Sequence, residues 1–259
     1  MLASLPMYDW PEVRAATDAW WAGIARHAGL SFPLTRARDY AGLWRRDDLI
    51  FSQTCGYPFT HGLSANLDLI ATPHYDTDGC AGPNYLSFVF ARERPSQLAE
   101  LAGSIAAVNT PDSMSGMLAL KLVFAPLARS GRFFRGAVET GSHVASLQAV
   151  RDGAADVCAV DAVCVGLARR YRPDYLEGLV EIARSPSVPG LPYVTSVKTS
   201  SDLRRRLGEA VTAALSDPSL AEPRRALLIS GLSVLAPEEY QAILMRERDC
   251  EAHGGLDLL

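Results

Sequence analysis

The sequence predicts an α/β fold built from two lobes. Three observations lead to this prediction. Short apolar runs rich in β-branched residues alternate with segments whose apolar residues recur at helical spacing. Several of the apolar runs end in Ser, Thr or Gly just before such a helical segment begins. The chain has 259 residues, 48% of them hydrophobic, which suffices for one large domain or two smaller ones.

The first lobe is expected to consist of residues 1–88 and 188–259. Its long first helix should begin at Pro11, which suits the first helical position, and end near Gly29. Pro237 marks the start of the last helix in the same way. Strands are predicted at 3–8, 48–53, 67–75 and 84–92, and the later helices at 200–217, 223–230 and 237–248.

The second lobe is expected to be an insertion at residues 92–184, and the sheets of both lobes are expected to be largely parallel. The segment 185–196 contains three prolines and is interpreted as an extended return path. Crossings near 88–92 and 184–188 would form a hinge, with a ligand cleft between the lobes. In the insertion, strands are predicted at 104–108, 133–140, 155–160 and 179–185, and helices at 115–129, 142–152 and 162–170.

Composition excludes several classes of protein. The net charge is −4 and no basic stripe is present, so a nucleic-acid partner is not expected. No apolar run is long enough to span a membrane. The N-terminus lacks a signal-peptide pattern, which predicts a cytoplasmic protein as written, or a periplasmic one if a leader has been removed. Five cysteines at irregular spacing give no disulfide framework.

No metal or cofactor is expected. A metal site made of Cys55, His61, His74 and Cys80 is conceivable, but the spacing of these residues matches no standard pattern.

The segment 108–123, VNTPDSMSGMLALKLV, joins a buried strand to a helix. The first turn of a helix has free backbone N–H groups and a partial positive charge. Ser113 and Ser115 would add hydroxyl donors, and Gly116 would let an anion approach the backbone. With the N–H groups of Met114 and Gly116, these parts suit a phosphate, phosphonate or carboxylate. The alternative is that a serine is only an N-cap.

Two more strand ends carry polar residues. In ETGSHVASLQAV (139–150), Ser142 and His143 open a helix, and His143 could donate to the same anion. Helix N-termini gather at the carboxyl edge of a parallel sheet, so the two junctions support each other. Asp161 follows another strand and could pair with a ligand amine or cap the next helix.

The first lobe offers two candidates for the opposite wall of the cleft. Tyr8 follows the first predicted strand and could cover a ligand and donate its hydroxyl. Thr54 follows the second predicted strand. Each lies in what is by default an ordinary loop.

Standard enzyme motifs are absent. A Ser115–His143–Asp161 triad is formally possible, although the sequence does not show the geometry it needs. An enzyme with Cys55 as nucleophile and His143 as base is the main alternative. A regulatory module that contacts a partner through Trp20, Trp21 and the C-terminal helices is the third.

The chain resembles the substrate-binding proteins of phosphate, phosphite and phosphonate ABC transporters. The likeness rests on four motifs, which match in order and spacing. They are NTPDSMSG (109–116), TGSHVASLQAV (140–150), ADVCAVD (155–161) and SPSVPGLPYV (185–194).

The resemblance implies a type II periplasmic-binding-protein fold that closes on its ligand. It also implies an oxyanion held by Ser113, Met114 and Ser115, with contacts from His143 and Tyr8. Met114 departs from the family pattern, since phosphonate binders often have Thr there. The expected function is non-catalytic binding of a small oxyanion, as a transport receptor with an ABC permease or as a sensor.

Overall fold

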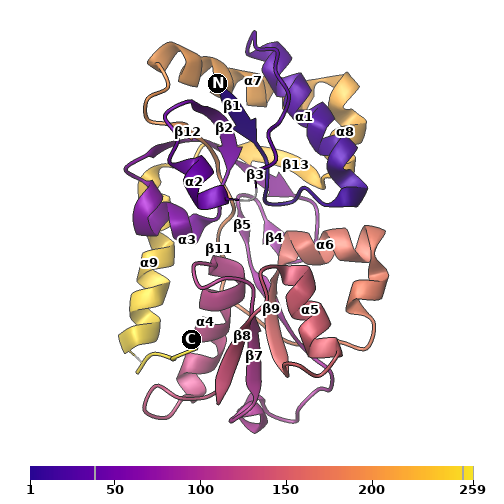
Figure 1. The fold of residues 1–259 in the computed structure, drawn as a ribbon, viewed down its shortest axis with the longest axis vertical. Coiled ribbons are helices and arrows are strands. Elements are labelled where there is room, and N and C mark those ends of the chain that lie inside the picture. The colour runs from indigo at the N-terminus through magenta and orange to yellow at the C-terminus, as the bar shows by residue number, and fades with distance from the viewer. Residues whose placement is uncertain (38, 253, 259) are drawn as a thin grey trace. The chain divides into compact units, whose positions relative to one another are not determined.

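The computed structural model describes residues 1–37, 39–252 and 254–258, and the chain divides into two compact units (Figure 1). Unit 1 comprises Met1–Asp76, Ala81–Pro83 and Pro189–Tyr240. Unit 2 comprises Thr77–Cys80, Asn84–Val188 and Gln241–Leu259. Each unit contains a five-stranded sheet with helices packed on it. The chain passes from one unit to the other after Asp76, within the short strand β4 (Cys80–Ala81), after Pro83, within the short strand β11 (Val188–Pro189), and within helix α9 (Pro237–Ala252).

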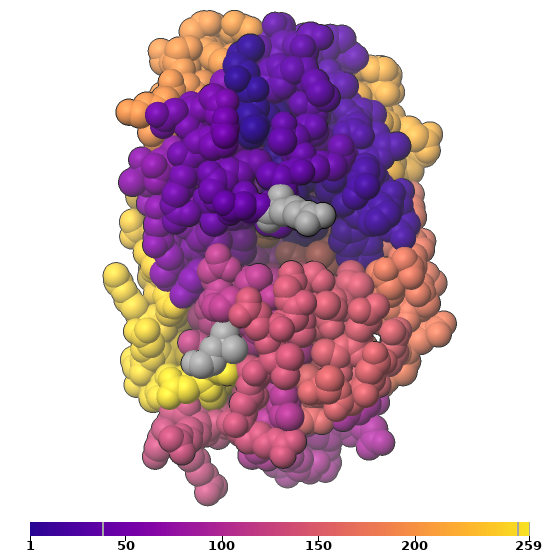
Figure 2. Space-filling view, viewed as in Figure 1, coloured from indigo at the N-terminus to yellow at the C-terminus, as the bar shows by residue number. Residues whose placement is uncertain are grey.

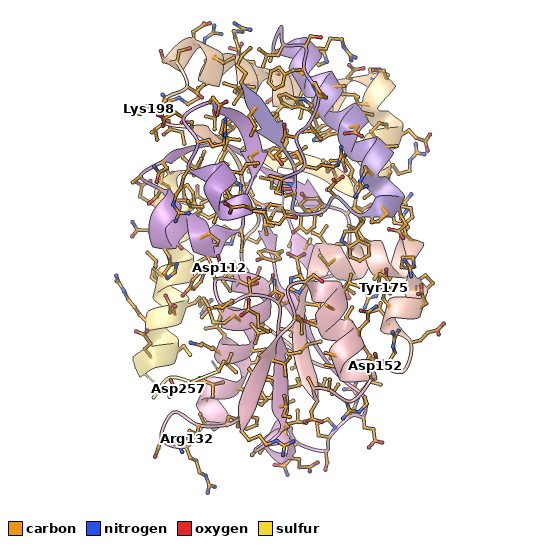
Figure 3. All side chains as sticks on the ribbon, viewed as in Figure 1. Asp112, Arg132, Asp152, Tyr175, Lys198 and Asp257 are labelled. Carbon is orange, nitrogen blue, oxygen red and sulfur yellow. The ribbon has the colours of Figure 1, made fainter. Side chains whose placement is uncertain are left out.

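The C-terminal segment differs from the prediction, which placed all of 188–259 in the first lobe. From Gln241 onward the chain belongs to unit 2. The backbone N–H of Asp257 donates to the carbonyl of Gly131 at 2.9 Å, and Leu256 and Leu258 are buried. The C-terminal atoms accordingly cover part of the unit 2 surface (Figure 2), and Asp257 lies near the loop of Arg132 (Figure 3). Burial of two leucines thus attaches this segment to unit 2.

The sheet of unit 1 is mixed rather than largely parallel. β1 and β2 pair in parallel, whereas β12 runs antiparallel to both β2 and β3, and β13 is antiparallel to β3. The proline-rich return path therefore supplies the central strand, β12, whose four residues are all buried. The helix predicted at 223–230 is wrong in its second half, because β13 begins at Ile229. In sheet order, the strands are β1 (Leu2–Ser4), β2 (Leu49–Gln53), β12 (Tyr193–Ser196), β3 (Leu67–Tyr75) and β13 (Ile229–Ser233).

Helix α1 (Arg14–His27) provides the aromatic core of unit 1. Trp20 and Trp21 are almost completely buried. Trp21 stacks on Phe51 with ring centroids 5.3 Å apart, and the Trp20 indole N–H donates to the hydroxyl of Tyr193 at 3.0 Å. The partner contact through this pair, raised as the third possibility from the sequence, is therefore not supported, because both rings are packed in the core. The other α-helices of unit 1 are α2 (Tyr40–Trp44), α3 (Gly56–Pro58), α7 (Ser201–Ser216) and α8 (Ala221–Ala226).

The sheet of unit 2, in the order β10-β6-β9-β7-β8, is also mixed rather than largely parallel. β7 pairs in parallel with β8 and β9, while β6 runs antiparallel to β9 and β10. Val108 pairs with Glu139, and Ala107 with Cys158, so the carboxyl ends of β7, β8 and β9 share one edge. The strands are β5 (Asn84–Tyr85), outside this sheet, then β6 (Ser87–Ala91), β7 (Ile105–Val108), β8 (Gly136–Glu139), β9 (Val157–Asp161) and β10 (Val180–Arg184).

The helices of unit 2 begin at this shared edge, as Figure 1 shows for α4 and α5. A π-helical turn, η4 (Met114–Leu118), runs directly into α4 (Ala119–Phe124). The helices α5 (His143–Arg151) and α6 (Ala162–Tyr171) follow β8 and β9. Three strand-to-helix junctions therefore lie at one edge, because the strands that precede them are parallel neighbours.

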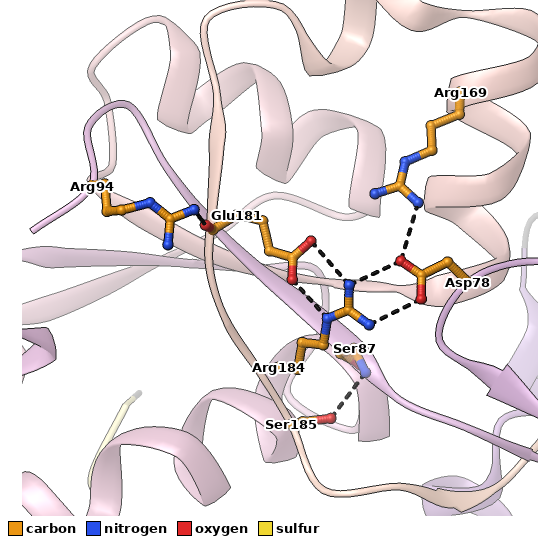
Figure 4. A network of polar contacts seen from close by, with 7 residues as sticks. All are labelled: Asp78, Ser87, Arg94, Arg169, Glu181, Arg184 and Ser185. Atoms are coloured by element: carbon orange, nitrogen blue, oxygen red, sulfur yellow. Dashed lines mark hydrogen bonds and ion pairs between the residues drawn. The ribbon is translucent and has the colours of Figure 1, made fainter.

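An ion-pair network lies elsewhere in unit 2 (Figure 4). The Arg184 guanidinium donates to both carboxylate oxygens of Asp78 at 2.9 Å and to Glu181 at 2.7 Å. These hydrogen bonds hold the pKa of Asp78 below its usual value. The side chains of Arg184 and Asp78 are 42% and 47% exposed, so the pair contributes about 1 kcal/mol or less.

Candidate functional site

At the first junction, after β7, two main-chain N–H groups make no hydrogen bond within the described residues. Ser113 is the N-cap of η4, and its Oγ accepts the Gly116 N–H at 3.0 Å. Among the described residues, the N–H groups of Met114 and Ser115 have no acceptor, as expected for the first turn of a helix. The prediction that the Gly116 N–H is available to an anion is therefore wrong, because the cap occupies it. The N–H of Ser115 is available instead.

Gly116 is required for a reason that the sequence did not reveal. A Cβ atom at this position would lie 1.8 Å from Oδ1 of Asn109. Asn109 follows β7 directly, and its Oδ1 is buried with no hydrogen-bond partner among the described residues. Asn109 was missed as a site residue, although it opens the NTPD motif. Buried polar atoms without a partner are uncommon in folded proteins.

The second junction, after β8, is capped in the same way. Ser142 is the N-cap of α5, and its Oγ accepts the N–H of Ala145 at 3.2 Å. The N–H groups of His143 and Val144 have no acceptor within the described part of the chain. Thr140, also missed as a site residue, orders the turn through a 2.6 Å hydrogen bond to the Ser146 hydroxyl.

A hydrogen bond joins these two helix starts. Oγ of Ser115 lies 2.8 Å from Nε2 of His143. Burial lowers the pKa of His143 to about 4, although the main-chain carbonyl of Ala159 acts in the opposite direction. The imidazole is therefore neutral near pH 7. The predicted convergence of Ser115 and His143 is present in unit 2, and together the two helix starts offer four free N–H groups.

Asp161, at the third junction, is the N-cap of α6, and its side chain accepts main-chain N–H groups of the first turn. Its side chain accepts the N–H groups of Val163 at 2.7 Å and Cys164 at 3.3 Å, and the residue is 2% exposed. The N-cap role considered from the sequence is thus present. A contact between Asp161 and a ligand amine stays a prediction.

The two candidates in unit 1 are well packed. Tyr8 is 7% exposed, meets the ring of Tyr75 edge-on at 5.3 Å, and lines a cavity of about 20 Å³ together with Gln53. Gln53 donates to the hydroxyl of Tyr75 at 2.9 Å. Thr54 is fully buried, with its hydroxyl on the Cys55 carbonyl. Ligand contacts by Tyr8 and Thr54 stay predictions.

A metal site and a membrane-spanning helix were each looked for in the described part of the chain. It contains no cluster of three or more His, Cys, Asp or Glu residues placed to hold a metal ion, so the conceivable group of Cys55, His61, His74 and Cys80 does not form one. None of its helices is both long and apolar enough to cross a membrane.

Comparisons with known proteins identify the family and the fold of this chain. The family model for the periplasmic substrate-binding protein of phosphonate ABC transporters matches residues 2–240. No curated protein matches this sequence.

Solved structures with the same fold include PhnD1 from Prochlorococcus marinus in complex with methylphosphonate (TM-score 0.76, 16% identity, 96% of this chain and 98% of that one). A binding-protein component of an ABC phosphonate transporter from Pseudomonas aeruginosa is equally similar (TM-score 0.76, 17% identity, 97% and 87%). The protein XAC2383 from Xanthomonas citri, bound to ATP, is a third (TM-score 0.72, 17% identity, 97% and 98%).

These findings decide between the alternatives raised by the sequence. The fold is that of the type II periplasmic-binding proteins. The family consists of substrate-binding proteins rather than enzymes, so the proposed Cys55 and His143 catalytic pair has no support from it. The family is periplasmic, and its model covers most of this sequence. The chain therefore belongs to the periplasmic substrate-binding proteins of phosphonate ABC transporters.

Proposed function

We propose that this chain binds a small phosphorus oxyanion, phosphate or a phosphonate, and delivers it to an ABC permease. The observation that carries the proposal is the 2.8 Å contact between Ser115 Oγ and His143 Nε2. It brings together two helix N-termini whose first turns keep four N–H groups without acceptors among the described residues. Helix N-termini with free N–H groups are favourable places for an anion.

The anion is held by main-chain groups and neutral side chains. Met114 is buried and contributes its N–H, so the absence of a threonine hydroxyl at this position does not remove the main-chain donor. The methylphosphonate bound by PhnD1 from Prochlorococcus marinus supports a ligand of this class.

A thermal-shift panel tests the proposal. Phosphate, phosphite, methylphosphonate, sulfate and small carboxylates are each added at millimolar concentration to the full chain. A ligand at about 100 times its Kd stabilises the folded state by about 2.7 kcal/mol. We expect a rise in Tm with at least one phosphorus oxyanion, and calorimetric titration then gives the Kd.

Two variants separate the site from the rest of the protein. Ser115→Ala removes the hydroxyl at the meeting point of the helices and should weaken binding. Ser96→Ala removes an exposed hydroxyl that bonds to Glu100 elsewhere in unit 2, so it should leave binding unchanged. If no phosphorus oxyanion raises the Tm, the proposed function is wrong. If Ser115→Ala binds as tightly as the parent and Ser96→Ala do, the anion is bound elsewhere and the proposed site is wrong.

A further inference from the structure

A second candidate site is a cavity in unit 1, which shares no residue with the helix junctions of unit 2. The cavity has a volume of about 130 Å³, and every described residue that lines it belongs to unit 1. A cavity of about 150 Å³ accepts benzene, so this one has room for an aromatic ring or a short branched chain. Its apolar wall includes Leu5, Pro6, Leu34 and Tyr40, and its charged wall consists of Asp9, Arg14 and Arg36.

Hydrogen bonds hold the walls of this cavity in place. The backbone N–H of Thr35 donates to the carbonyl of Ala3 at 2.7 Å, which ties the segment before α2 to β1. The Arg36 guanidinium donates to both carboxylate oxygens of Asp9, at 2.6 and 3.2 Å, and to Asp18 of α1 at 2.9 Å. These contacts form the cavity before any ligand enters, so binding requires little ordering of the protein.

The charged groups of the cavity differ in what they leave for a ligand. Both oxygens of Asp9 already accept from Arg36, and the Asp9 side chain is only 10% exposed. Arg14 approaches Asp9 through Nε at 3.8 Å, which is too long for a hydrogen bond. Its guanidinium makes no hydrogen bond among the described residues, and its side chain is 51% exposed. The group that is available to a ligand is thus a cation.

The other charges near the cavity favour a ligand with one negative charge. Arg36 is neutralised by its two aspartate partners, so Arg14 is the one described cation of the cavity wall without a hydrogen-bonded acceptor. Glu12, just before α1, and Asp39, the N-cap of α2, are exposed and do not line the cavity, so solvent screens them. A single guanidinium matches a single planar carboxylate, which it can bind through two parallel hydrogen bonds.

We propose that this cavity is a second ligand site, which binds a small carboxylate carrying an aromatic ring or a short branched apolar group. The carboxylate pairs with the exposed guanidinium of Arg14. The apolar group enters the cavity and packs against Leu5, Leu34 and Tyr40, where its burial removes apolar surface from water. This inference goes beyond the proposed oxyanion site and does not depend on it.

Benzoate is the probe, and three analogues each change one of its features. Acetate lacks the ring, benzamide lacks the charge, and benzylamine carries the opposite charge. Each compound is titrated into the full chain by calorimetry at neutral pH. Benzoate should bind at least about tenfold more tightly than any of the three, because a buried ring and a charge-assisted hydrogen bond each account for about tenfold or more in affinity.

Variants of Arg14 test the source of the affinity. Arg14→Gln removes the cation and should weaken benzoate binding about tenfold. Arg14→Lys keeps the charge but loses the planar pair of donors, and its affinity should be intermediate. Both variants should fold, since the side chain lies half in solvent. Arg205→Gln changes an exposed arginine of α7 that pairs with Asp202 and Glu209, and it should leave benzoate binding unchanged.

The outcomes separate this inference from the proposed function. The second site is wrong if benzoate does not bind at millimolar concentration, or if acetate, benzamide or benzylamine binds as tightly as benzoate. It is also wrong if Arg14→Gln binds benzoate as the parent does. Arg14→Gln should still bind methylphosphonate as the parent does, and loss of both ligands in this variant would overturn the assignment of two separate sites. Failure of every phosphorus oxyanion to bind would overturn only the proposed function.

Discussion

Replacing Gly116 with alanine should destabilise the protein, although the same change usually stabilises a helix. A Cβ atom at this position would lie 1.8 Å from Oδ1 and 2.8 Å from Cγ of Asn109, so the Asn109 side chain must move. Crowding of this kind costs about 1–3 kcal/mol. The gain in helix propensity is about 0.5–1 kcal/mol. The net loss is thus up to about 2.5 kcal/mol, or up to roughly 10 °C in Tm for a chain of this size.

Two further variants make this prediction specific. Gly208 lies inside α7, and a Cβ atom added there would meet nothing within 4 Å, so Gly208→Ala should stabilise by about 0.5–1 kcal/mol. Asn109→Ala removes the atoms that clash and should cost little, because Oδ1 has no partner among the described residues. In that background, Gly116→Ala should become neutral or stabilising.

Thermal unfolding of the parent and these variants provides the measurement. Equal Tm shifts for Gly116→Ala and Gly208→Ala would refute the contact between Gly116 and Asn109. So would a loss of stability in Gly116→Ala that Asn109→Ala does not relieve.

Two other predictions concern a buried ring and a buried hydrogen bond. Burial lowers the pKa of His143 to about 4 in the folded chain, whereas a histidine of the unfolded chain has a pKa of about 6.5. Between these two pH values the unfolded chain binds a proton that the folded chain does not. Folding stability should therefore fall as the pH drops from about 6.5 to about 4. Urea unfolding should show that His143→Gln removes about 3 kcal/mol of this pH dependence, and identical pH profiles would contradict the assigned burial. Tyr193→Phe leaves the buried indole N–H of Trp20 without its acceptor and should cost about 1–3 kcal/mol. In a double-mutant cycle with Trp20→Phe the two losses should not add, whereas additive losses would show that the hydrogen bond contributes nothing.

Several features of this protein follow from local sequence alone. The strand at 67–75 was predicted with its observed bounds, and the helices after Ser142 and at Pro237 begin where the sequence places the cap or the proline. At Pro11 a 3-10 turn, Pro11–Val13, begins instead, and α1 follows it from Arg14. Such features depend on neighbours within a few residues, which side-chain periodicity and capping preferences report directly. The two Ser-capped junctions were recognisable for the same reason.

Other features depend on residues far apart in the chain, and only the tertiary structure decided them. Tyr193 and Val194 follow a proline-rich stretch, yet they form a central strand because β2 and β3 pair with them on either side. Leu256 and Leu258 attach the C-terminus to unit 2 because their burial there removes apolar surface from water. The sequence indicated hydroxyls and a histidine at two helix starts. The fold determined that Ser115 and His143 meet, because parallel strands bring distant junctions to one edge. It also determined that Ser113 Oγ accepts the Gly116 N–H, and that Oδ1 of Asn109 has no partner among the described residues.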